Sequence, residues 1–410
     1  MKRYVIVGNG VAAAACVEGV RSRDRDGSIT VISAETRPVY CRPLISYYLE
    51  GKTGQEKMDY RPGDFYEENG CRVLYGTKAV CLDPAAKTVT TDDGETVYYD
   101  ALCIAAGSAP FVPPFEGLET VQDKYTFMTL DDALALEKAT ETQKDVLIVG
   151  AGLIGLKCAE GLSGRAKSIT VCDLAGRVLS SILDDEGAKT VQAHLEGHGL
   201  RFLLGNTATR FEGNTAYMKN GETVPFDVLV LAVGVKPNVL LIRDAGGAVG
   251  RGITVNERME TSLPDVYAAG DCAEGEDISC GMRRVLAIMP NAYLQGHAAG
   301  VNMAGGNESF GNAVPMNAIG FFGLHLMTAG FYTGEVYEEK TPHGSKKFFT
   351  ENGLLKGFIL IGETQRAGLY TSLIRNQTPL ADVDFDLLRQ TATAAAFPAG
   401  TRADMFGEVV

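Results

Sequence analysis

Two glycine-rich turns carry the residue types in this sequence that are best suited to binding a nucleotide. The first contains Gly8 and Gly10, with Ala13 at the third position of the pattern, and lies between an apolar run and a helical stretch. Glu35 follows at the end of a second apolar run. Free N–H groups at the start of a helix, reinforced by the helix dipole, bind phosphate anions, and a later acid accepts hydrogen bonds from a ribose. Residues 4–35 therefore predict a dinucleotide site.

A second copy of this pattern occupies residues 146–173. Gly150, Gly152 and Gly155 follow an apolar run and open a helical stretch, and Asp173 ends the next apolar run. One such pattern alone is weak evidence, but here strand, turn, helix and acid recur in order. Two copies predict two bound dinucleotides. The copies also align at three positions beyond the glycines: Cys16 with Cys158, Glu18 with Glu160, and Gly19 with Gly161.

The acid of the second copy bears on which nicotinamide nucleotide binds. A carboxylate at Asp173 accepts hydrogen bonds from a free 2′-hydroxyl and repels a 2′-phosphate, so NADH is expected in preference to NADPH. Arg177 follows four residues later and could pair with a 2′-phosphate, which keeps NADPH as the less favoured alternative.

The composition is that of a globular protein with more than one domain. At about 150 residues per domain, 410 residues predict two or three. With 38 Lys and Arg against 51 Asp and Glu, the net charge is −13, which disfavours a nucleic-acid surface because binding phosphates requires clustered cations. No apolar run approaches the roughly 18 residues of a membrane span, and the N-terminus enters a strand at once, which leaves no room for a signal peptide. We expect a cytoplasmic protein.

Nine cysteines are spread through apolar stretches without a CxxC motif. This odd, scattered set predicts reduced and mostly buried thiols in a reducing compartment, and neither a protein-bound iron–sulfur cluster nor a structural zinc site. His194 and His198 are the only spaced histidine pair, and zinc would need further ligands that are not near in sequence. No metal site is expected.

Local patterns predict several further elements. Residues 59–70 are expected to form a polar helix, residues 71–104 short strands between turns, and residues 110–114 a linker marked by prolines. Arg42 precedes Pro43 and is therefore expected to be extended, with its guanidinium free to reach a phosphate.

The second half of the chain contains one more turn with a suitable acid. A strand is expected to end at Gly270 and Asp271, where the carboxylate could bind a polyol, and a helix is expected to begin near Pro290 and Asn291. From residue 306 the sequence predicts strands and a helix within residues 367–376, without another nucleotide pattern, and residues 391–410 are expected to form a loose tail.

In this order the motifs resemble a known family. They are GNGVAA with Glu35, YCRPLIS at residues 40–46, AAGSAP, GAGLIG with Asp173, AVGVKPN and YAAGDCAE. The chain is similar over nearly its whole length to the flavoprotein reductases of the glutathione-reductase superfamily, which have two dinucleotide-binding domains. Within that superfamily, the Arg-Pro helix and the last hundred residues look like the NADH:rubredoxin reductases and the flavin portion of the nitrite reductase large subunit.

The resemblance implies an α/β protein with two Rossmann-like, glutathione-reductase-like domains, the NAD domain being inserted in a split FAD domain. The FAD domain would comprise residues 1–111 and 239–305, and the NAD domain residues 112–238. Residues 306–410 would form a small α+β interface domain with a loose tail.

The resemblance also assigns cofactor-binding residues. Gly8, Gly10, Ala13 and Glu35 would hold the ADP half of FAD, and Gly150, Gly152, Gly155 and Asp173 would hold NADH. The remaining contacts with FAD would come from Arg42, Pro43, Val80, Ala106, Gly107, Gly270, Asp271, Pro290 and Asn291. Asp271 would hold the ribitol or the pyrophosphate, and the helix that starts at Pro290 would direct its N-terminus at the N1–C2 edge of the flavin, where it would stabilise negative charge.

Two positions beside the expected flavin depart from the pattern of many relatives. Those relatives have Lys after the Ser of the Arg-Pro helix and Glu after the third glycine of the NAD motif, and this chain has Tyr47 and Lys157. Our hypothesis is that Lys157 takes over the cationic position while Tyr47 covers the flavin face. The alternative is that both side chains face solvent.

The active-site disulfide of the disulfide-reducing relatives is also missing. Cys41 stands alone where those relatives have CxxxxC. A single cysteine could cycle through sulfenic acid, as in the NADH peroxidases and oxidases, but the local motif differs and an ordinary thiol beside the FAD is the favoured interpretation.

The resemblance implies an NADH-dependent reductase in which hydride passes from nicotinamide C4 to flavin N5 and electrons then pass to a rubredoxin, a ferredoxin or an iron–sulfur subunit. Two alternatives remain: an NADH oxidase or peroxidase, with or without Cys41, and an electron-transfer subunit of a larger iron–sulfur complex. The chain could also be a homodimer. Candidate basic docking pairs for an acidic partner are Arg283 with Arg284 and Lys346 with Lys347, although solvated pairs are the plainer interpretation.

Overall fold

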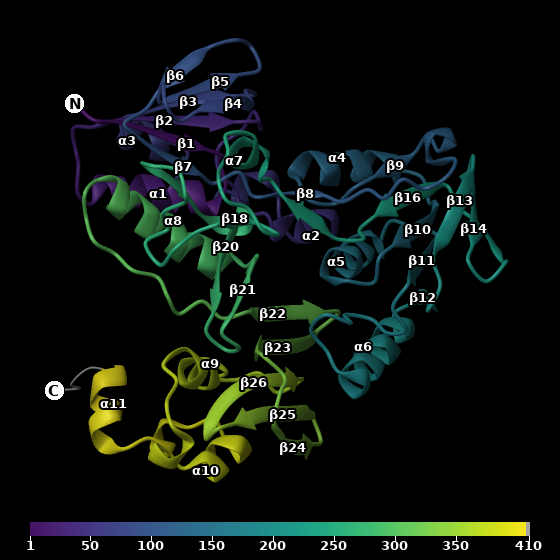
Figure 1. Ribbon diagram of the computed structural model, residues 1–410. Helices are drawn as coiled ribbons and strands as arrows, with labels where there is room; N and C mark the ends of the chain where they lie inside the picture. Colours follow the sequence, from purple (N-terminus) through teal and green to yellow (C-terminus); the bar gives the residue numbers. More distant parts are fainter. Residues whose placement is uncertain (407–410) are drawn as a thin grey trace.

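The computed structural model describes residues 1–406, which form three regions (Figure 1). The first region lies at the upper left of Figure 1, the second at the right, and the third, coloured green to yellow, lies below them. No helix within residues 1–406 is long and apolar enough to cross a bilayer.

The first region is built around a parallel sheet with the strand order β19-β7-β1-β2-β3. Its strands are β1 (Arg3–Val7), β2 (Ser28–Ser33), β3 (Cys71–Tyr75), β7 (Ala101–Ile104) and β19 (Val266–Ala268). The central strands are apolar and buried, as is usual for parallel strands covered on both faces. Since β19 follows the second region in sequence, two separate segments of chain make this one sheet.

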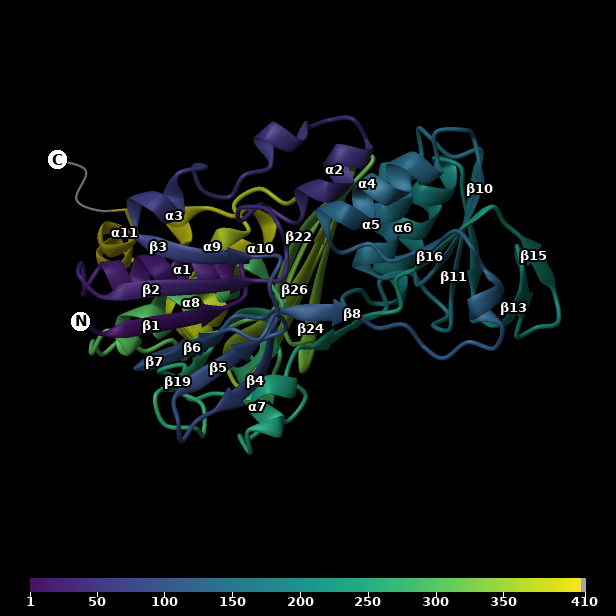
Figure 2. The ribbon, with the colours of Figure 1, turned by 90° about the horizontal axis from the view of Figure 1, so that it is seen from above.

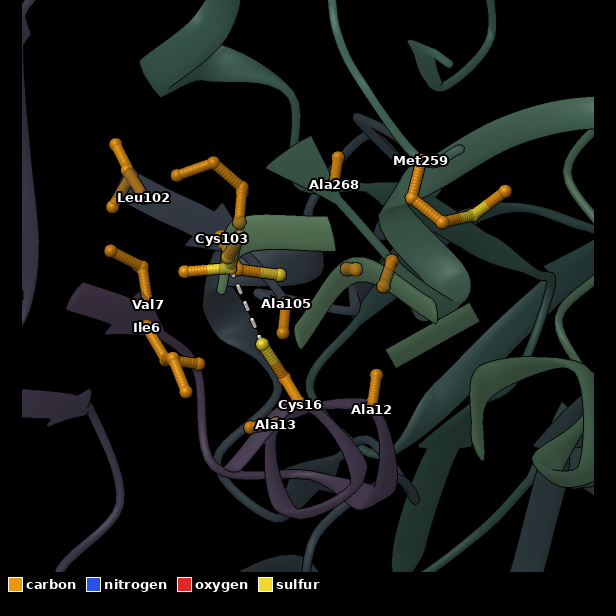
Figure 3. Packing of buried hydrophobic residues seen from close by; sticks show 14 of the residues in the cluster. Ile6, Val7, Ala12, Ala13, Cys16, Leu102, Cys103, Ala105, Met259 and Ala268 are labelled. Atoms are coloured by element: carbon orange, nitrogen blue, oxygen red, sulfur yellow. Dashed lines mark hydrogen bonds between the residues drawn. The ribbon is translucent and has the colours of Figure 1, made fainter. Parts of the chain in front are cut away.

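Helices α1 (Val11–Arg21) and α8 (Met289–Met303) pack against each other through small residues. A Cβ atom on Gly296 would lie 2.1 Å from the carbonyl oxygen of Ala12, and one on Gly300 would lie 2.1 Å from that of Cys16. Figure 3 shows Ala12, Ala13 and Cys16 in the apolar core beside the first sheet. Ala12 faces Gly296 and, one turn later, Cys16 faces Gly300, so the two helices are parallel. The N-termini of α1 and α8 therefore lie at the same edge of the sheet.

The second region repeats this architecture, with the parallel strand order β12-β11-β10-β16-β9. The strands are β9 (Lys124–Tyr125), β10 (Asp145–Val149), β11 (Ser168–Asp173), β12 (Leu200–Leu204) and β16 (Val228–Leu231). Its helices are α4 (Leu130–Ala139), α5 (Leu153–Leu162) and α6 (Asp185–Gly197). The predicted α/β class with two Rossmann-like sheets is confirmed.

Smaller elements complete these two regions. The antiparallel strands are β4 (Ala79–Asp83), β5 (Thr88–Thr91), β6 (Thr96–Tyr98), β13 (Ala208–Glu212), β14 (Thr215–Met218), β15 (Thr223–Pro225), β20 (Ala273–Asp277) and β21 (Met282–Arg284), and β18 (Ile253–Thr254) adds parallel to β20. Short helices are α2 (Leu44–Leu49), α3 (Phe65–Glu68) and α7 (Leu240–Asp244). The chain crosses between the regions twice, and the crossings pair as β8 (Ser108–Pro110) and β17 (Val235–Pro237).

The third region is an antiparallel sheet with the order β22-β23-β26-β25-β24, seen from above in Figure 2. Its strands are β22 (Met316–Phe321), β23 (Leu324–Gly330), β24 (Glu335–Thr341), β25 (Gly344–Glu351) and β26 (Leu354–Ile361), and its helices are α9 (Gly368–Arg375), α10 (Phe385–Gln390) and α11 (Ala399–Phe406). The sheet packs on the second region: Phe321 and Phe349 share a buried apolar cluster with helix α6. Lys347 also pairs with Asp184 at the start of α6, at 2.6 Å.

The structure corrects four local predictions. Residues 59–70 are mostly turn, with a helix only at Phe65–Glu68, because too few apolar side chains are available to bury a longer one. The strand β19 ends at Ala268, and Gly270–Cys272 form a 3₁₀ turn. Arg42 lies in a turn closed by the hydrogen bond from Leu44 N–H to the Cys41 carbonyl, and is not extended.

The fourth correction concerns the expected loose tail. Residues 394–396 form a 3₁₀ turn, and Phe397 is 4% exposed in the apolar cluster of the third region. Burial of this aromatic ring stabilises an ordered conformation of the segment, although its sequence has no helical or strand periodicity. Residues 407–410 of the predicted tail lie outside the described residues.

Candidate functional site

The first glycine turn lies at the carboxyl edge of the first sheet. Gly8 has φ +117°, and a Cβ atom there would lie 2.1 Å from the carbonyl oxygen of Ala105 after strand β7. Gly10 is the N-cap of α1, and a Cβ atom there would meet no protein atom within 4 Å. The fold therefore requires glycine at the first position, whereas the second glycine leaves open space in front of free helix N–H groups. This space suits a pyrophosphate.

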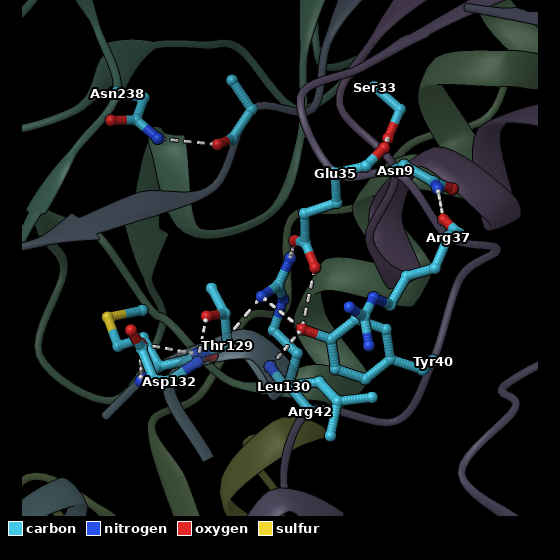
Figure 4. Close-up of polar contacts among 12 residues, drawn as sticks. Asn9, Ser33, Glu35, Arg37, Tyr40, Arg42, Thr129, Leu130, Asp132 and Asn238 are labelled. Atoms are coloured by element: carbon cyan, nitrogen blue, oxygen red, sulfur yellow. Dashed lines mark hydrogen bonds and ion pairs between the residues drawn. The ribbon is translucent and has the colours of Figure 1, made fainter. Parts of the chain in front are cut away.

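Glu35, Tyr40 and Arg42 form a polar cluster at this edge (Figure 4). The Tyr40 hydroxyl donates to Glu35 Oε2 at 2.9 Å and accepts from the backbone N–H of Leu130 at 3.0 Å. The Arg42 guanidinium pairs with Glu35 and also donates to the Tyr40 hydroxyl at 3.1 Å. The acid expected to bind a ribose and the cation expected to bind a phosphate thus lie side by side and pair with each other.

Asp271 lies near Arg42 and is mostly withdrawn from solvent. Burial raises the pKa of the Asp271 carboxyl, and the Arg42 charge partly opposes this. Burial acts to lower the pKa of Arg42, but the neighbouring Tyr40, Glu35 and Asp271 outweigh it and the pKa is raised. A protein that maintains such a desolvated carboxylate beside an arginine gains a strong hydrogen-bond acceptor for a polyol or for a phosphate-linked hydroxyl.

The N-terminus of α8 closes the same edge. Pro290 stands in the first turn of α8, and Gly270 N–H donates to the buried Gln295 Oε1 at 2.9 Å, which fixes the Asp271 turn against this helix. Asn291 is fully buried, and its Oδ1 atom has no hydrogen-bond partner within the described residues. A buried amide oxygen without a partner is costly, so a donor from a bound group would stabilise it. The residues present therefore fit FAD.

Asn238 links the crossing strand β17 to this edge. Its side-chain amide donates to the Ala106 carbonyl at 2.8 Å, and its backbone N–H donates to the Gly107 carbonyl at 3.0 Å. Gly107 has φ +62°, which favours glycine. Val80, in contrast, is 56% exposed at a bulge in β4, outside the polar cluster of Glu35, Tyr40 and Arg42.

The second glycine turn reproduces the first on the second sheet. Gly150 has φ +119°, and a Cβ atom there would lie 2.2 Å from the Ala232 carbonyl oxygen. A Cβ atom on Gly152, the N-cap of α5, would meet nothing within 4 Å, whereas one on Gly155 would lie 1.9 Å from the Gly150 carbonyl oxygen. The geometry thus gives each glycine its own role: Gly150 makes a tight turn, Gly152 leaves space for a ligand, and Gly155 allows the helix to pack closely on the turn.

Asp173 ends strand β11 and faces this turn. Its carboxylate accepts from the backbone N–H groups of Ala151 at 2.6 Å and Ala175 at 2.7 Å. Arg177 is directed elsewhere: it pairs with Asp185 at 2.8 Å and donates to the Ser180 carbonyl at 3.3 Å. This arrangement favours a nucleotide with a free 2′-hydroxyl.

The two nucleotide-binding regions meet where α2 packs on α5. A Cβ atom on Gly161 would lie 3.1 Å from the Ser46 carbonyl oxygen, so the helices touch directly. At this contact the Lys157 ammonium lies 4.9 Å from the centre of the Tyr47 ring and forms an ion pair with Glu160. The structure therefore brings together the two departures from the family pattern. The Lys157 side chain is 19% exposed, whereas Tyr47 is 38% exposed.

Cys41 is half-buried one residue before Arg42. Burial raises the pKa of its thiol, and a hydrogen bond with the Leu44 backbone partly opposes this. All nine cysteines are free, five of them buried. A raised pKa reduces the thiolate fraction, which is the reactive form, so this environment favours an ordinary thiol.

One of the two basic pairs proposed as docking sites is engaged inside the protein. Lys346 is 8% exposed and donates to the Gln390 carbonyl, and Lys347 pairs with Asp184 and Glu186. Arg284 pairs with the fully buried Asp277 at 3.1 Å, but its own side chain is 41% exposed and Arg283 is exposed. The lysine pair is therefore not a set of solvated cations, whereas the arginine pair lies at the surface. The two histidines serve packing: His194 contacts the Phe321 carbonyl and His198 stacks on Phe322.

Comparison with known proteins agrees with this geometry. The family model for pyridine nucleotide-disulphide oxidoreductases matches residues 2–296. The chain belongs to this family. The epsilon subunit of NADH-dependent phenylglyoxylate dehydrogenase from Aromatoleum evansii is 32% identical over 393 residues, or 92% of each chain. The assimilatory nitrate reductase electron transfer subunit of Bacillus subtilis is 31% identical over 92% of this chain and 50% of its own length, so this chain spans about half of that protein.

Solved structures share the fold. Putidaredoxin reductase in its covalent complex with putidaredoxin matches with a TM-score of 0.88 at 23% identity, over 96% of this chain and 97% of that one. NADH:rubredoxin oxidoreductase from Clostridium acetobutylicum matches with a TM-score of 0.76 at 23% identity, over 93% and 97%. The predicted family is confirmed, and with it the enzyme class: an FAD-dependent NAD(P)H oxidoreductase with FAD and NADH as cofactors.

The sequence did not assign a role to Tyr40, Gln295 or Glu160. Tyr40 stood in the YCRPLIS motif beside its partners Glu35 and Arg42, but its partner Leu130 N–H is 90 residues away, and the partner of Gln295 is 25 residues away. Glu160 did carry a signal: it aligns with Glu18 in the first copy, and Glu18 also forms an ion pair, with Arg61 at 2.6 Å. An acid repeated at the same place in both helices, and ion-paired in both, indicates a position that needs a charged partner.

Gly10→Ala should fold normally and bind FAD more weakly, by at least about tenfold or 1.4 kcal/mol, because alanine tolerates the extended backbone while its methyl group would occupy the space for the pyrophosphate. Flavin content per chain and the FAD dissociation constant measure this, with Gly63→Ala in an open loop as the control. Full FAD affinity in Gly10→Ala would mean that this turn does not face the cofactor.

Asp271→Asn should change how the stability of the deflavinated protein depends on pH. Because the pKa of Asp271 is raised in the folded state, the folded protein holds this proton longer, and the free energy of unfolding falls as pH rises from about 3.9 through the folded pKa. Asparagine removes this loss, so the variant should gain stability relative to the wild type as pH rises through that window. Urea unfolding at several pH values tests this, and a constant difference between the two proteins would contradict it.

Proposed function

We propose that this chain is an NADH-dependent flavoprotein reductase that delivers electrons to a small redox protein or to an iron–sulfur subunit. When bound, FAD takes up a hydride from NADH and releases electrons one at a time to such a carrier. The observation that carries the proposal is the packing of α2 on α5, which places the Tyr47 ring, shortly after the Arg42 turn, 4.9 Å from Lys157 in the first half of α5. Transfer between two dinucleotides requires adjoining sites, and this contact supports such an arrangement.

Each group of residues has a defined task in this proposal. The N–H groups behind Gly10 and Gly152 bind the two pyrophosphates, and Asp173 binds the adenosine ribose of NADH. Asp271 and the N-terminus of α8 hold the polar parts of FAD, and the helix dipole stabilises negative charge there by typically 0.3–1 kcal/mol. Lys157 and Tyr47 would lie beside the flavin, where the two nucleotides would meet.

The relatives support an electron-transfer role. The names of two of them describe a subunit of an NADH-dependent dehydrogenase and an electron transfer subunit, and another is a nitric oxide reductase FlRd-NAD(+) reductase, 31% identical over 74% of this chain. These names favour a protein acceptor. They also keep open the alternative that the chain is one subunit of a larger iron–sulfur complex, or that it forms a homodimer.

An NADH oxidase or peroxidase is the second candidate function. A relative named NADH oxidase from Methanocaldococcus jannaschii is 33% identical over 75% of this chain. Cys41, half-buried beside Arg42, would be its reactive group, although burial raises the pKa of this thiol and reduces its thiolate fraction.

The domain division follows from the same proposal. Residues 1–111 and 239–305 form the FAD domain, residues 112–238 the NAD domain, and residues 306–410 the interface domain. A cytoplasmic location is proposed as well, supported by nine free cysteines, because unpaired thiols are usual in reducing compartments.

Anaerobic stopped-flow spectroscopy tests the function. NADH should reduce the bound flavin, and rubredoxin or ferredoxin should then reoxidise it faster than oxygen or peroxide does. Fast peroxide turnover that is lost in Cys41→Ser would support the second candidate, and co-purification with an iron–sulfur protein would support the complex subunit. Purification without any flavin would contradict all three.

A further inference from the structure

Lys157 is held by three regions of the protein at once. Its side chain is 19% exposed, and the ammonium pairs with Glu160 on its own helix α5. It donates to the Gly320 carbonyl of strand β22 at 3.2 Å, and it lies 4.9 Å from the centre of the Tyr47 ring on α2. A cation over the face of an aromatic ring is stabilised by the ring quadrupole. The position of this charge is therefore defined from several sides.

Glu160 is the buried partner that anchors this arrangement. Its side chain is 4% exposed, and its Oε1 atom accepts the backbone N–H of Phe322 at 2.6 Å while Oε2 binds Lys157. Both carboxylate oxygens thus have a donor. Loss of the carboxylate would leave Lys157 without its counter-charge and Phe322 N–H without its acceptor. Breaking a buried ion pair in this way strongly destabilises the folded protein.

The β22–β23 hairpin provides two of these contacts, the Gly320 carbonyl bound by Lys157 and the Phe322 N–H bound by Glu160. Phe322 and Gly323 form a two-residue turn with φ +47° and +87°, as in a type I′ hairpin, where asparagine and glycine are usual and a bulky residue is strained. The Phe322 ring stacks on His198, with ring centres 4.4 Å apart, and His194 contacts the Phe321 carbonyl at 2.9 Å. The turn is thereby fixed against α5 and α6 of the second region.

We propose that Glu160, together with the β22–β23 turn, is a positioning residue that holds the Lys157 ammonium at the Tyr47 ring, where this charge disfavours bound NAD⁺ relative to NADH. The proposal rests on the proposed function, because it requires the nicotinamide to reach the contact between α2 and α5. It gives the third region a direct part in the nucleotide site.

The physical basis is the charge that the reaction moves. Loss of a hydride converts the neutral nicotinamide ring of NADH into the cationic ring of NAD⁺, and the electron pair with its hydrogen passes to the flavin. A fixed ammonium nearby repels the cationic product and stabilises negative charge gained by the flavin, and both effects favour transfer in the direction from NADH.

The test compares Lys157→Met, Lys157→Arg and Glu160→Gln in the flavin-loaded protein. The NAD⁺ dissociation constant is measured by titration of the reduced enzyme, and the NADH dissociation constant from the concentration dependence of flavin reduction. Lys52→Met is the matched control: Lys52 also lies over the Tyr47 ring, at 5.7 Å, but it is 58% exposed and pairs with Glu50. Melting temperature and flavin content report any structural damage.

Lys157→Met should bind NAD⁺ about tenfold more tightly, equivalent to 1.4 kcal/mol, with little change for NADH, and Lys157→Arg and Lys52→Met should resemble the wild type. Glu160→Gln keeps an acceptor for Phe322 N–H but releases Lys157, so NAD⁺ binding should again tighten, by about threefold. Full flavin content in each variant would show that these shifts do not arise from loss of the fold.

Two results would overturn the proposal. An unchanged ratio of NAD⁺ to NADH affinity in Lys157→Met would show that this charge does not act on the nicotinamide. Weaker NAD⁺ binding in Glu160→Gln would show that Glu160 screens Lys157 and does not place it. Either result leaves the proposed function intact as long as NADH reduces the wild-type flavin. A wild type that NADH does not reduce would instead contradict the function itself.

Discussion

Two glycines without room for a side chain determine how this protein presents its sites. At Gly8 and at Gly150 the backbone has a positive φ, and a Cβ atom would lie about 2 Å from a carbonyl oxygen of the adjacent strand connection. Each turn is therefore held tightly against its sheet, and the following helix must begin with free N–H groups at the carboxyl edge. Everything proposed for the two nucleotides depends on this repeated constraint.

The contact between the regions depends on other small residues. Gly161 lets α2 lie directly on α5, and Gly296 and Gly300 let α8 lie on α1, so that its N-terminus reaches the first turn. Long side chains then define the site between them. Tyr40 and Arg42 meet Glu35 on one side, and Lys157, paired with Glu160, meets Tyr47 on the other. The β22–β23 hairpin adds to this second group through Phe322 N–H and the Gly320 carbonyl, which is why we propose that the third region contributes to the site.

The parts that could be predicted from the sequence are those with a local cause. Glycine spacing, the acids that follow, and the helix start at Pro290 depend on neighbours within a few residues, and the structure has these elements where the patterns placed them. Partners distant in sequence could not be read in this way. Lys346 and Lys347 were candidates for a docking surface, yet tertiary contacts bury them, and Phe397 anchors a segment that has no periodicity. Glu160 was visible only as a repeated acid, because its partner Phe322 N–H is 162 residues away.

The central claim is that one chain holds two dinucleotides in separate sites that meet between α2 and α5. Native mass spectrometry of the purified chain, titrated with ADP-ribose as an unreactive fragment of NADH, tests it most directly. The account predicts one FAD per chain that stays bound while one ADP-ribose is added. Release of FAD in proportion to the ADP-ribose bound would mean that both ligands use the same site, and would contradict the account.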